Sequence, residues 1–146
     1  MIGEISNDIL ERVRSVGALT SSTSFAIGGK ATDPALKEIP LPACRLILLN
    51  IFPDEDPHTT GTSRGPGIVP RTQVMLFDYR ALVIVPYGDD NDILNVQFPL
   101  LESVASAVKA NTAPSGHRWR FLGQKLSFVY PDRMGYEQRF TVDVTL

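Results

Sequence analysis

The chain has 146 residues, a net charge of −2 and one cysteine, Cys44, so it has the length of a single domain and no intrachain disulfide. Apolar residues make up 43% and charged residues 21%, as in ordinary globular proteins. The slight acidity argues against a dedicated nucleic-acid binder. The longest apolar run, Ala81–Val85, is far shorter than the roughly 20 residues of a membrane-spanning helix. No secretory signal is visible in the first residues.

The first predicted element is an amphipathic helix over residues 3–16. Its apolar residues recur at three- and four-residue spacing and fall on one side of the helix, opposite the charged residues. This stripe consists of Ile2, Ile5, Ile9, Val13 and Val16. Gly17 is expected to end the helix.

Residues 18–53 predict short strands between turns. Phe25–Ile27 favours a short strand, and Gly28-Gly29 a turn. Prolines exclude a long helix before residue 43, although Pro34–Glu38 allows a turn or two. The apolar run Arg45–Leu49 predicts a buried strand. Cys44 precedes it and is expected to be a small core residue.

The segment from Phe52 to Arg71 is the most irregular part of the sequence. It is rich in proline and glycine and contains the acidic cluster Asp54–Asp56. A loop of this length without structure of its own is uncommon inside a compact domain. We therefore expect it to be disordered or to act as an arm that becomes ordered on a partner.

Residues 72–109 predict a long strand, a loop and a second helix. The strand covers Thr72–Val85, and its apolar second half indicates a central position in a sheet. After the loop Pro86–Asp92, the second helix is expected to begin at Pro99, with Phe98 extended before it. The apolar stripe of this helix consists of Leu101, Val104, Ala105 and Val108.

The last thirty residues alternate between apolar and polar side chains, as strands do. We expect strands at 117–121, at 126–130 and at 140–146, with a turn at 131–135. These elements predict an α+β fold, with a single-layer, mostly antiparallel sheet of four to five strands and two main helices on one or both faces. The whole chain, residues 1–146, forms one domain, with the irregular loop or arm at about 52–72.

The motifs that could carry chemistry are incomplete. Gly29-Lys30 lacks the first glycine and the Ser or Thr of a phosphate-binding loop. Asp89–Asp92 lacks the later ligands of a calcium loop, so it favours a solvated acidic loop before a helix. Asp54–His58 favours a charged patch over a metal site. We find no candidate catalytic residue and expect no cofactor and no metal.

The charges are unevenly distributed along the chain. Ser115–Arg139 has five basic and two acidic residues, whereas Asp54–Asp56 and Asp89–Asp92 together have six acids and no base. Separated patches of opposite charge allow copies to associate head to tail, in contacts that close into a ring if the rotation permits. The alternative, that these charges only keep the surface soluble, is equally compatible with the sequence. Trp119, between Arg118 and Arg120, favours a core tryptophan over a nucleic-acid contact.

The order of these elements resembles the tail terminator proteins of contractile-tailed, Mu-like bacteriophages. The resemblance is carried by the strand Cys44–Asn50, the strand Phe77–Val85 with its Phe-Asp-Tyr-Arg start, the helix Pro99–Val108 and the final strands ending in Phe140–Val144. It covers most of the chain, but no part of it is a diagnostic motif. The region Pro34–Pro42 has no counterpart in that pattern.

The resemblance implies a non-enzymatic virion protein with an α/β layer fold. Such proteins assemble as a homohexameric ring on the last ring of the tail tube protein and end tail polymerisation. They present a surface to the head–tail connector or neck protein and contact the last ring of the tail sheath protein. The expected location is the head-proximal end of the tail in the virion, and the host cytoplasm during assembly. Neither sequence-specific nucleic-acid binding nor membrane binding is expected.

Two interface hypotheses follow. The arm at 52–72 would contact partners, and an edge strand, with Phe140–Leu146 as the first candidate, would pair with a neighbouring chain. The candidate interface residues are charged residues of the arm and of the C-terminal basic stretch: Asp54, Glu55, Asp56, Arg64, Arg71, Arg118, Arg120 and Arg133. Three alternatives stay open: another neck or tail-completion protein, a component of a phage-tail-like secretion or toxin-delivery system, and a small α/β enzyme or ligand-binding domain.

Overall fold

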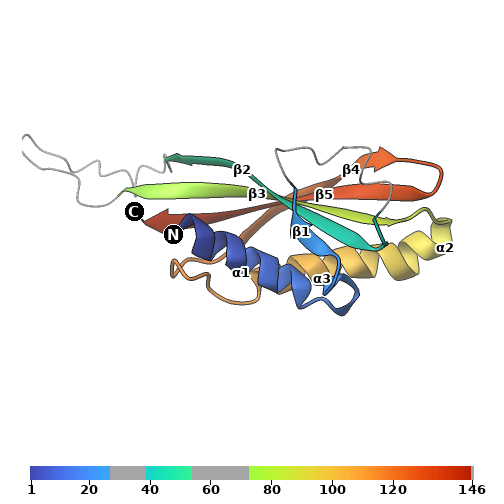
Figure 1. The fold of residues 1–146 in the computed structure, drawn as a ribbon, viewed down its shortest axis with the longest axis horizontal. Coiled ribbons are helices and arrows are strands. Elements are labelled where there is room, and N and C mark those ends of the chain that lie inside the picture. Colours follow the sequence, from blue (N-terminus) through green and yellow to red (C-terminus); the bar gives the residue numbers. More distant parts are fainter. Residues whose placement is uncertain (27–38, 54–72, 146) are drawn as a thin grey trace, which may run out of the picture.

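A computed structural model describes residues 1–26, 39–53 and 73–145. Figure 1 shows its helices and strands, which form one elongated body. In chain order they are α1 (Ile2–Arg14), η1 (Gly17–Leu19), β1 (Thr23–Phe25), β2 (Ala43–Pro53), β3 (Val74–Pro86), α2 (Asp90–Asp92), the π-helical η4 (Ile93–Gln97), α3 (Phe98–Lys109), β4 (Arg120–Val129) and β5 (Arg133–Thr145).

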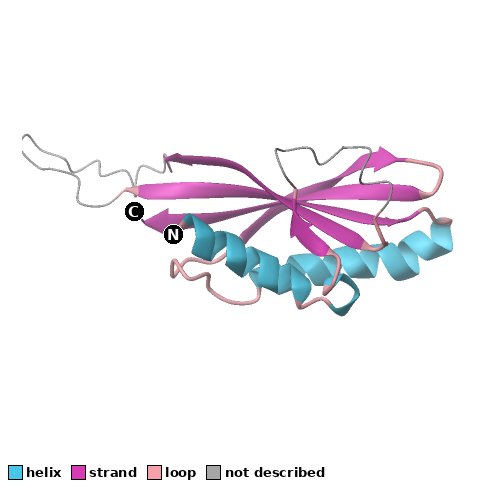
Figure 2. Ribbon diagram, in the orientation of Figure 1, coloured by secondary structure: helices cyan, strands magenta, loops and turns pink. Residues whose placement is uncertain are grey.

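The five strands form one sheet in the order β1-β2-β3-β5-β4. All neighbours are antiparallel except β1 and β2, which are parallel. The two main helices, α1 and α3, lie side by side on the same face of this sheet (Figure 2). The predicted α+β class, with a single, mostly antiparallel sheet of four to five strands, is confirmed, and the helices cover one face and not both.

The main core lies between the sheet and the two helices. Ile5, Ile9 and Val13 of α1 are fully buried, and the predicted stripe of α3 is buried with them. Alternate residues of the central strands face these helices, as the two-residue period of a strand requires. On β3 and β5 these residues are Phe77, Tyr79, Ala81, Val83, Val85, Met134, Tyr136, Phe140, Val142 and Val144. Cys44 packs in the same core, inside β2 and not before it.

The opposite face of the sheet has a small second core at one end. Leu82 and Ile84 of β3 are buried there against Ile39, Leu41 and Phe128. Phe128 lies directly over Gly135, where an added Cβ would come within 2.3 Å of the ring. Elsewhere on this face, β3 and β5 carry the charged residues Asp78, Arg80, Glu137 and Arg139.

Arg12 fixes α1 to the C-terminal end of α3. Its guanidinium donates to the carbonyl oxygens of Val108, Asn111 and Thr112 at 3.0, 3.0 and 2.8 Å. These carbonyls belong to the last turn of α3 and the residues after it. A cation at this position also interacts favourably with the negative end of the helix dipole. Asp8 accepts from Arg12 Nε at 2.7 Å and from the indole nitrogen of Trp119 at 2.8 Å.

The second helical region begins earlier than the sequence predicts. Phe98 is helical, with φ −64° and ψ −43°, and not extended. The chain is helical from Asp90, where the side chain of Asp89 accepts from the Asp92 backbone and the Asp92 side chain accepts from the Asp89 backbone. Tertiary contacts override the usual effect of Pro99 on the residue before it. The buried Gln97 amide donates to the Pro86 carbonyl oxygen at 2.9 Å and holds the segment on the sheet.

Two predictions about the C-terminal strands are wrong, and a third holds only for the end of the last strand. Residues 117–121 and 126–130 do not form separate strands, because β4 runs continuously from Arg120 to Val129. The predicted turn at 131–135 is shorter, since β5 already begins at Arg133. The last strand is an edge only at its end: β5 lies between β3 and β4, but its pairing with β4 stops at Thr141, so among the described residues Val142–Thr145 pair with β3 alone. A bulge interrupts the alternation of apolar and polar residues, so one bulged strand looks like two separate strands in the sequence.

Most of the predicted arm lies outside the described residues. Phe52 and Pro53 belong to β2 and were not expected in a strand. The positions 27–38, which include Gly29-Lys30 and Pro34–Glu38, also lie outside the described residues.

Candidate functional site

The outer side of β4 is an edge of the sheet. Within the described part of the chain, β4 pairs only with β5. Two bulges interrupt this pairing, one between Phe121 and Gln124 and one between Leu126 and Phe128. Gly123 lies in the first bulge with a φ of +115°, a conformation that favours glycine. Bulges bend an edge and so oppose the pairing of long, flat strands, but the stretch Gln124–Leu126 between them is regular.

A groove runs between β4 and α3 on the helix-covered side. It has a volume of about 290 Å³ and is lined by Phe98, Leu101, Glu102, Ala105, Phe121 and Gln124. Most of these side chains are apolar. Leu126 and Val129, on the same side of β4, are each about half exposed.

A buried glutamine, Gln138, is hydrogen-bonded to two residues that line this groove. The Gln138 side chain is fully buried, and its amide nitrogen donates to the Leu101 carbonyl at 3.0 Å and to Gln124 Oε1 at 3.1 Å. Its own oxygen has no hydrogen-bond partner among the described residues. Such an atom is uncommon in a folded protein.

A hollow of about 300 Å³ lies on the other side of β4, on the uncovered face of the sheet. Its lining is Arg80, Leu122, Gly123, Gln124, Lys125, Glu137 and Arg139. Three cations and one carboxylate therefore surround it. Arg80 and Arg139 are directly opposite each other on β3 and β5, an arrangement that repels unless anions intervene.

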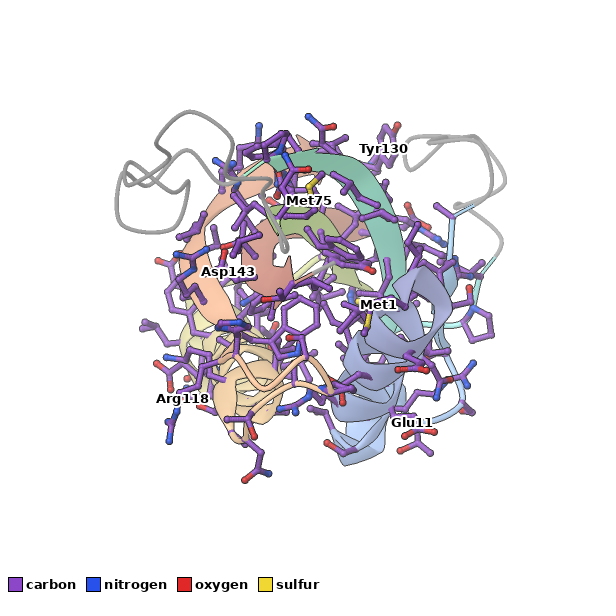
Figure 3. All side chains as sticks on the ribbon, turned by 90° about the vertical axis from the view of Figure 1, so that its left-hand side faces the viewer. Met1, Glu11, Met75, Arg118, Tyr130 and Asp143 are labelled. Carbon is purple, nitrogen blue, oxygen red and sulfur yellow. The ribbon has the colours of Figure 1, made fainter. Side chains whose placement is uncertain are left out.

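Ion pairs hold the two arginines in place. Asp78, only 5% exposed, pairs with Arg80 and, at 3.3 Å, with Arg139. Arg80 also pairs with Glu137 at 3.0 Å, and Lys125 lies 3.9 Å from the same carboxylate. Lys125 is 73% exposed, so its charge remains available to a partner. Figure 3 views the molecule end-on and labels Met75 of β3 and Asp143 of β5, the two adjacent strands that carry these arginines.

The predicted interface residues are placed differently from one another. Arg118 and Arg120 are exposed, as expected, and Arg120 pairs with Asp143 at 3.1 Å. Arg133 is not exposed as an interface residue would be, because it is buried at the start of β5 and pairs with Asp132 at 3.0 Å. A basic residue in a turn looks exposed in sequence, but this residue lies inside the strand. Asp54, Glu55, Asp56, Arg64 and Arg71 lie outside the described residues.

The sequence reasoning missed the charged cluster on β3 and β5. A usable signal was present, because Asp78 and Arg80, like Glu137 and Arg139, are two residues apart and so lie on one face of a strand. The pairing of β3 with β5 brings the four together, and the sequence alone did not reveal that pairing.

The acidic residues before α3 lie at one end of the molecule, in α2 and its cap. Asp89, Asp90 and Asp92 are exposed there beside Leu94 and Val96, which are about 60% exposed. A second hollow, of about 310 Å³, lies at this end between Pro42, Tyr87, Val96 and Leu100. The exposure expected for Asp89–Asp92 is confirmed, but these residues do not form a loop, because Asp89 caps α2 and Asp90–Asp92 form it.

Three ionisable groups, Cys44, Tyr79 and Tyr136, belong to the buried core. Burial raises the pKa of the Cys44 thiol to about 12, so the thiol stays protonated at neutral pH. Burial also raises the pKa of Tyr79 and of Tyr136. Trp119 is a core residue, as predicted, and contacts Tyr79 edge to face, with ring centroids 5.5 Å apart.

The described residues contain neither a metal-binding cluster nor a membrane-spanning helix. Among residues 1–26, 39–53 and 73–145, no group of three or more His, Cys, Asp or Glu side chains could hold a metal ion. None of the helices in these ranges is long and apolar enough to cross a membrane. The sequence matches no protein-family model and, at a significant level, no curated protein.

Proposed function

We propose that this chain is a structural virion protein that caps the tail tube of a contractile-tailed phage as a ring. In this role it ends tail polymerisation, forms the joint to the head connector or neck, and contacts the last sheath ring. The proposal rests first on the resemblance in the order of helices and strands. The α+β fold is compatible with it, because the two helices leave one sheet face and the outer edge of β4 for contacts.

The observation that carries the ring is the separation of opposite charges along the molecule. The acidic helix α2 lies at one end of the long axis, and the loop from α3 to β4, which carries Arg118, lies toward the other (Figure 1). Asp90 and Arg118 are both exposed. Copies arranged head to tail bring such ends together, and heterologous contacts of this kind close into rings when the rotation permits.

A charge swap tests the head-to-tail contact. Asp90→Lys and Arg118→Glu should each prevent ring formation on tails, and the two together in one chain should restore it, because the attraction is then only reversed. Glu11→Lys, an equal charge change at an exposed position of α1, is the matched control and should assemble normally. Failure of the double variant to assemble would mean that these ends do not meet.

The assay uses tails purified from particles that lack this protein. Added wild-type protein should appear by electron microscopy as a cap on the head-proximal end, and capped tails should take up no more tube protein. Cross-linked rings of six 16.0 kDa chains should have a mass of about 96 kDa. Binding elsewhere on the particle, or tubes that keep growing, would contradict the proposal and favour a different neck component.

Removal of residues 55–68 tests the predicted arm. Pro53 and Met75 are directly paired on β2 and β3, so six residues would still connect these strands after the deletion. Shortening the connection from 20 to six residues should stabilise the fold by about 1 kcal/mol through loop-closure entropy. The variant should therefore melt at or above the wild-type temperature but fail to cap tails. Normal capping would show that the arm is not an interface.

A further inference from the structure

We propose that the outer edge of β4 is a binding site for a short extended segment of another protein, in which apolar and acidic residues alternate. The segment would add to the sheet as a strand beside Gln124–Leu126. Its apolar side chains would enter the groove beside α3, and its acidic side chains would lie over the hollow lined by Arg80, Lys125 and Arg139. This inference concerns the single chain and does not depend on ring formation.

The backbone of β4 supplies the first part of the site. An edge strand presents unpaired N–H and C=O groups, and extended peptides bind such edges by completing the hydrogen-bond ladder. The two bulges limit the regular stretch to Gln124–Leu126. The expected partner is therefore a short segment of about four or five residues, and not a long strand.

The two recesses beside β4 supply the specificity. Successive side chains of a strand point to opposite faces of the sheet, so an added strand has one row of side chains on each side. On the helix side this row meets Phe98, Ala105 and Phe121. On the uncovered side it meets three cations and one carboxylate. One groove is thus suited to apolar residues, and the other to anions.

The positive character of the hollow remains after its internal ion pairs are counted. Asp78 lies beneath it and pairs with Arg80 and Arg139, and Glu137 pairs with Arg80. Two carboxylates therefore face three cations. Lys125 is the most exposed of these cations and lies 3.9 Å from Glu137, so its ammonium group is free to approach a second carboxylate.

A second copy of this chain does not supply the required segment from its described residues. Within these residues, an acid flanked on both sides by large apolar residues occurs only at Asp78 and at Asp143. Asp78 is paired on both sides, with β2 and with β5. Asp143 is paired with β3, its carbonyl oxygen accepts from Ser115 Oγ at 2.8 Å, and its carboxylate is bound to Arg120 at 3.1 Å. The charge pattern therefore points to another protein.

The test is NMR titration of the isotope-labelled full-length chain. The probe is an octapeptide that alternates valine and glutamate, and the controls are a valine–lysine alternation and a peptide with the valines and glutamates in two blocks. We expect saturable shifts of β4 and α3 amides with the probe at millimolar concentration, and weaker binding of both controls. The peptide amides form two alternate sets, and only one set faces β4 in an added strand. N-methylation of that set should abolish binding because it removes the hydrogen-bond donors, and N-methylation of the other set should not.

Matched variants separate the two rows of side chains. Lys125→Glu should weaken probe binding about fivefold, whereas Arg118→Glu, an equal change outside both recesses, should leave it unchanged. Phe98→Ser should weaken binding, and Leu49→Ser, at an exposed apolar residue of β2, should not.

Four results would overturn the proposal. They are an absence of saturable shifts, equal binding of the lysine peptide, shifts that cluster away from β4, and β4 shifts that depend on protein concentration without peptide. The last result would show that a second copy occupies the edge. A failure of tail capping, by contrast, would leave all of these peptide measurements unchanged.

Discussion

Replacement of Arg12 by alanine should strongly destabilise the fold. The guanidinium holds three carbonyl oxygens at the end of α3 and one carboxylate, that of Asp8. A hydrogen bond to a charged group contributes about 1.5–3 kcal/mol when it is sheltered. Only the bond to Val108 and the pair with Asp8 are partly buried, since water can replace Arg12 at the other two carbonyls. We therefore expect a loss of about 3 kcal/mol.

Urea unfolding, followed by circular dichroism and by the fluorescence of Trp119, measures this loss. Arg12→Lys should recover about half of it, because one ammonium group cannot span the three carbonyls. Arg118→Ala, at an exposed arginine, is the control and should change the free energy of unfolding by less than about 0.5 kcal/mol. If Arg12→Ala were as mild as this control, the link between the two helices would not contribute to stability.

Three further changes test the interior of the molecule. Stability should fall as the pH rises from about 9 toward 12, because the Cys44 thiol of the unfolded chain ionises near its ordinary pKa of about 8.5, whereas burial raises its pKa in the folded chain to about 12. Cys44→Ala should make stability less dependent on pH over this range, and an unchanged dependence would show that Cys44 is not its source. Gly135→Ala should cost about 1–3 kcal/mol in thermal unfolding because its Cβ collides with Phe128, and less in a Phe128→Ala background; additive losses would exclude the collision. Tyr79→Phe should cost about 1 kcal/mol by removing the 2.7 Å hydrogen bond to Ser6, and Ser6→Ala in addition should cost little more.

Local patterns predicted the helices and the core better than they predicted the contacts between strands. The buried stripe of α1 follows directly from its four-residue spacing, and Trp119 follows from alternation. The start of the second helical region was missed, because the capping of Asp89 and the contacts of Gln97 override the usual effect of Pro99. Such contacts join residues far apart in the sequence.

The candidate site was predicted only in part. Alternation in the sequence placed Arg118 and Arg120 at the surface, and the predicted turn at 131–135 also placed Arg133 there, although β5 begins at that residue and buries it. The charged hollow beside β4 depends on the pairing of β3 with β5 and of β5 with β4. A single sequence fixes the faces of each strand but not its neighbours, so a site shared by three strands could not be assembled from it.

The link between Arg12 and the end of α3 has a consequence for synthesis on the ribosome. The acceptors of its guanidinium follow it by 96 to 100 residues in the chain. At about 5–20 residues per second, the nascent first helix waits roughly 5–20 s before its partners have been made. During that interval its apolar stripe has no native surface to cover it, so holding chaperones have a defined window in which to act.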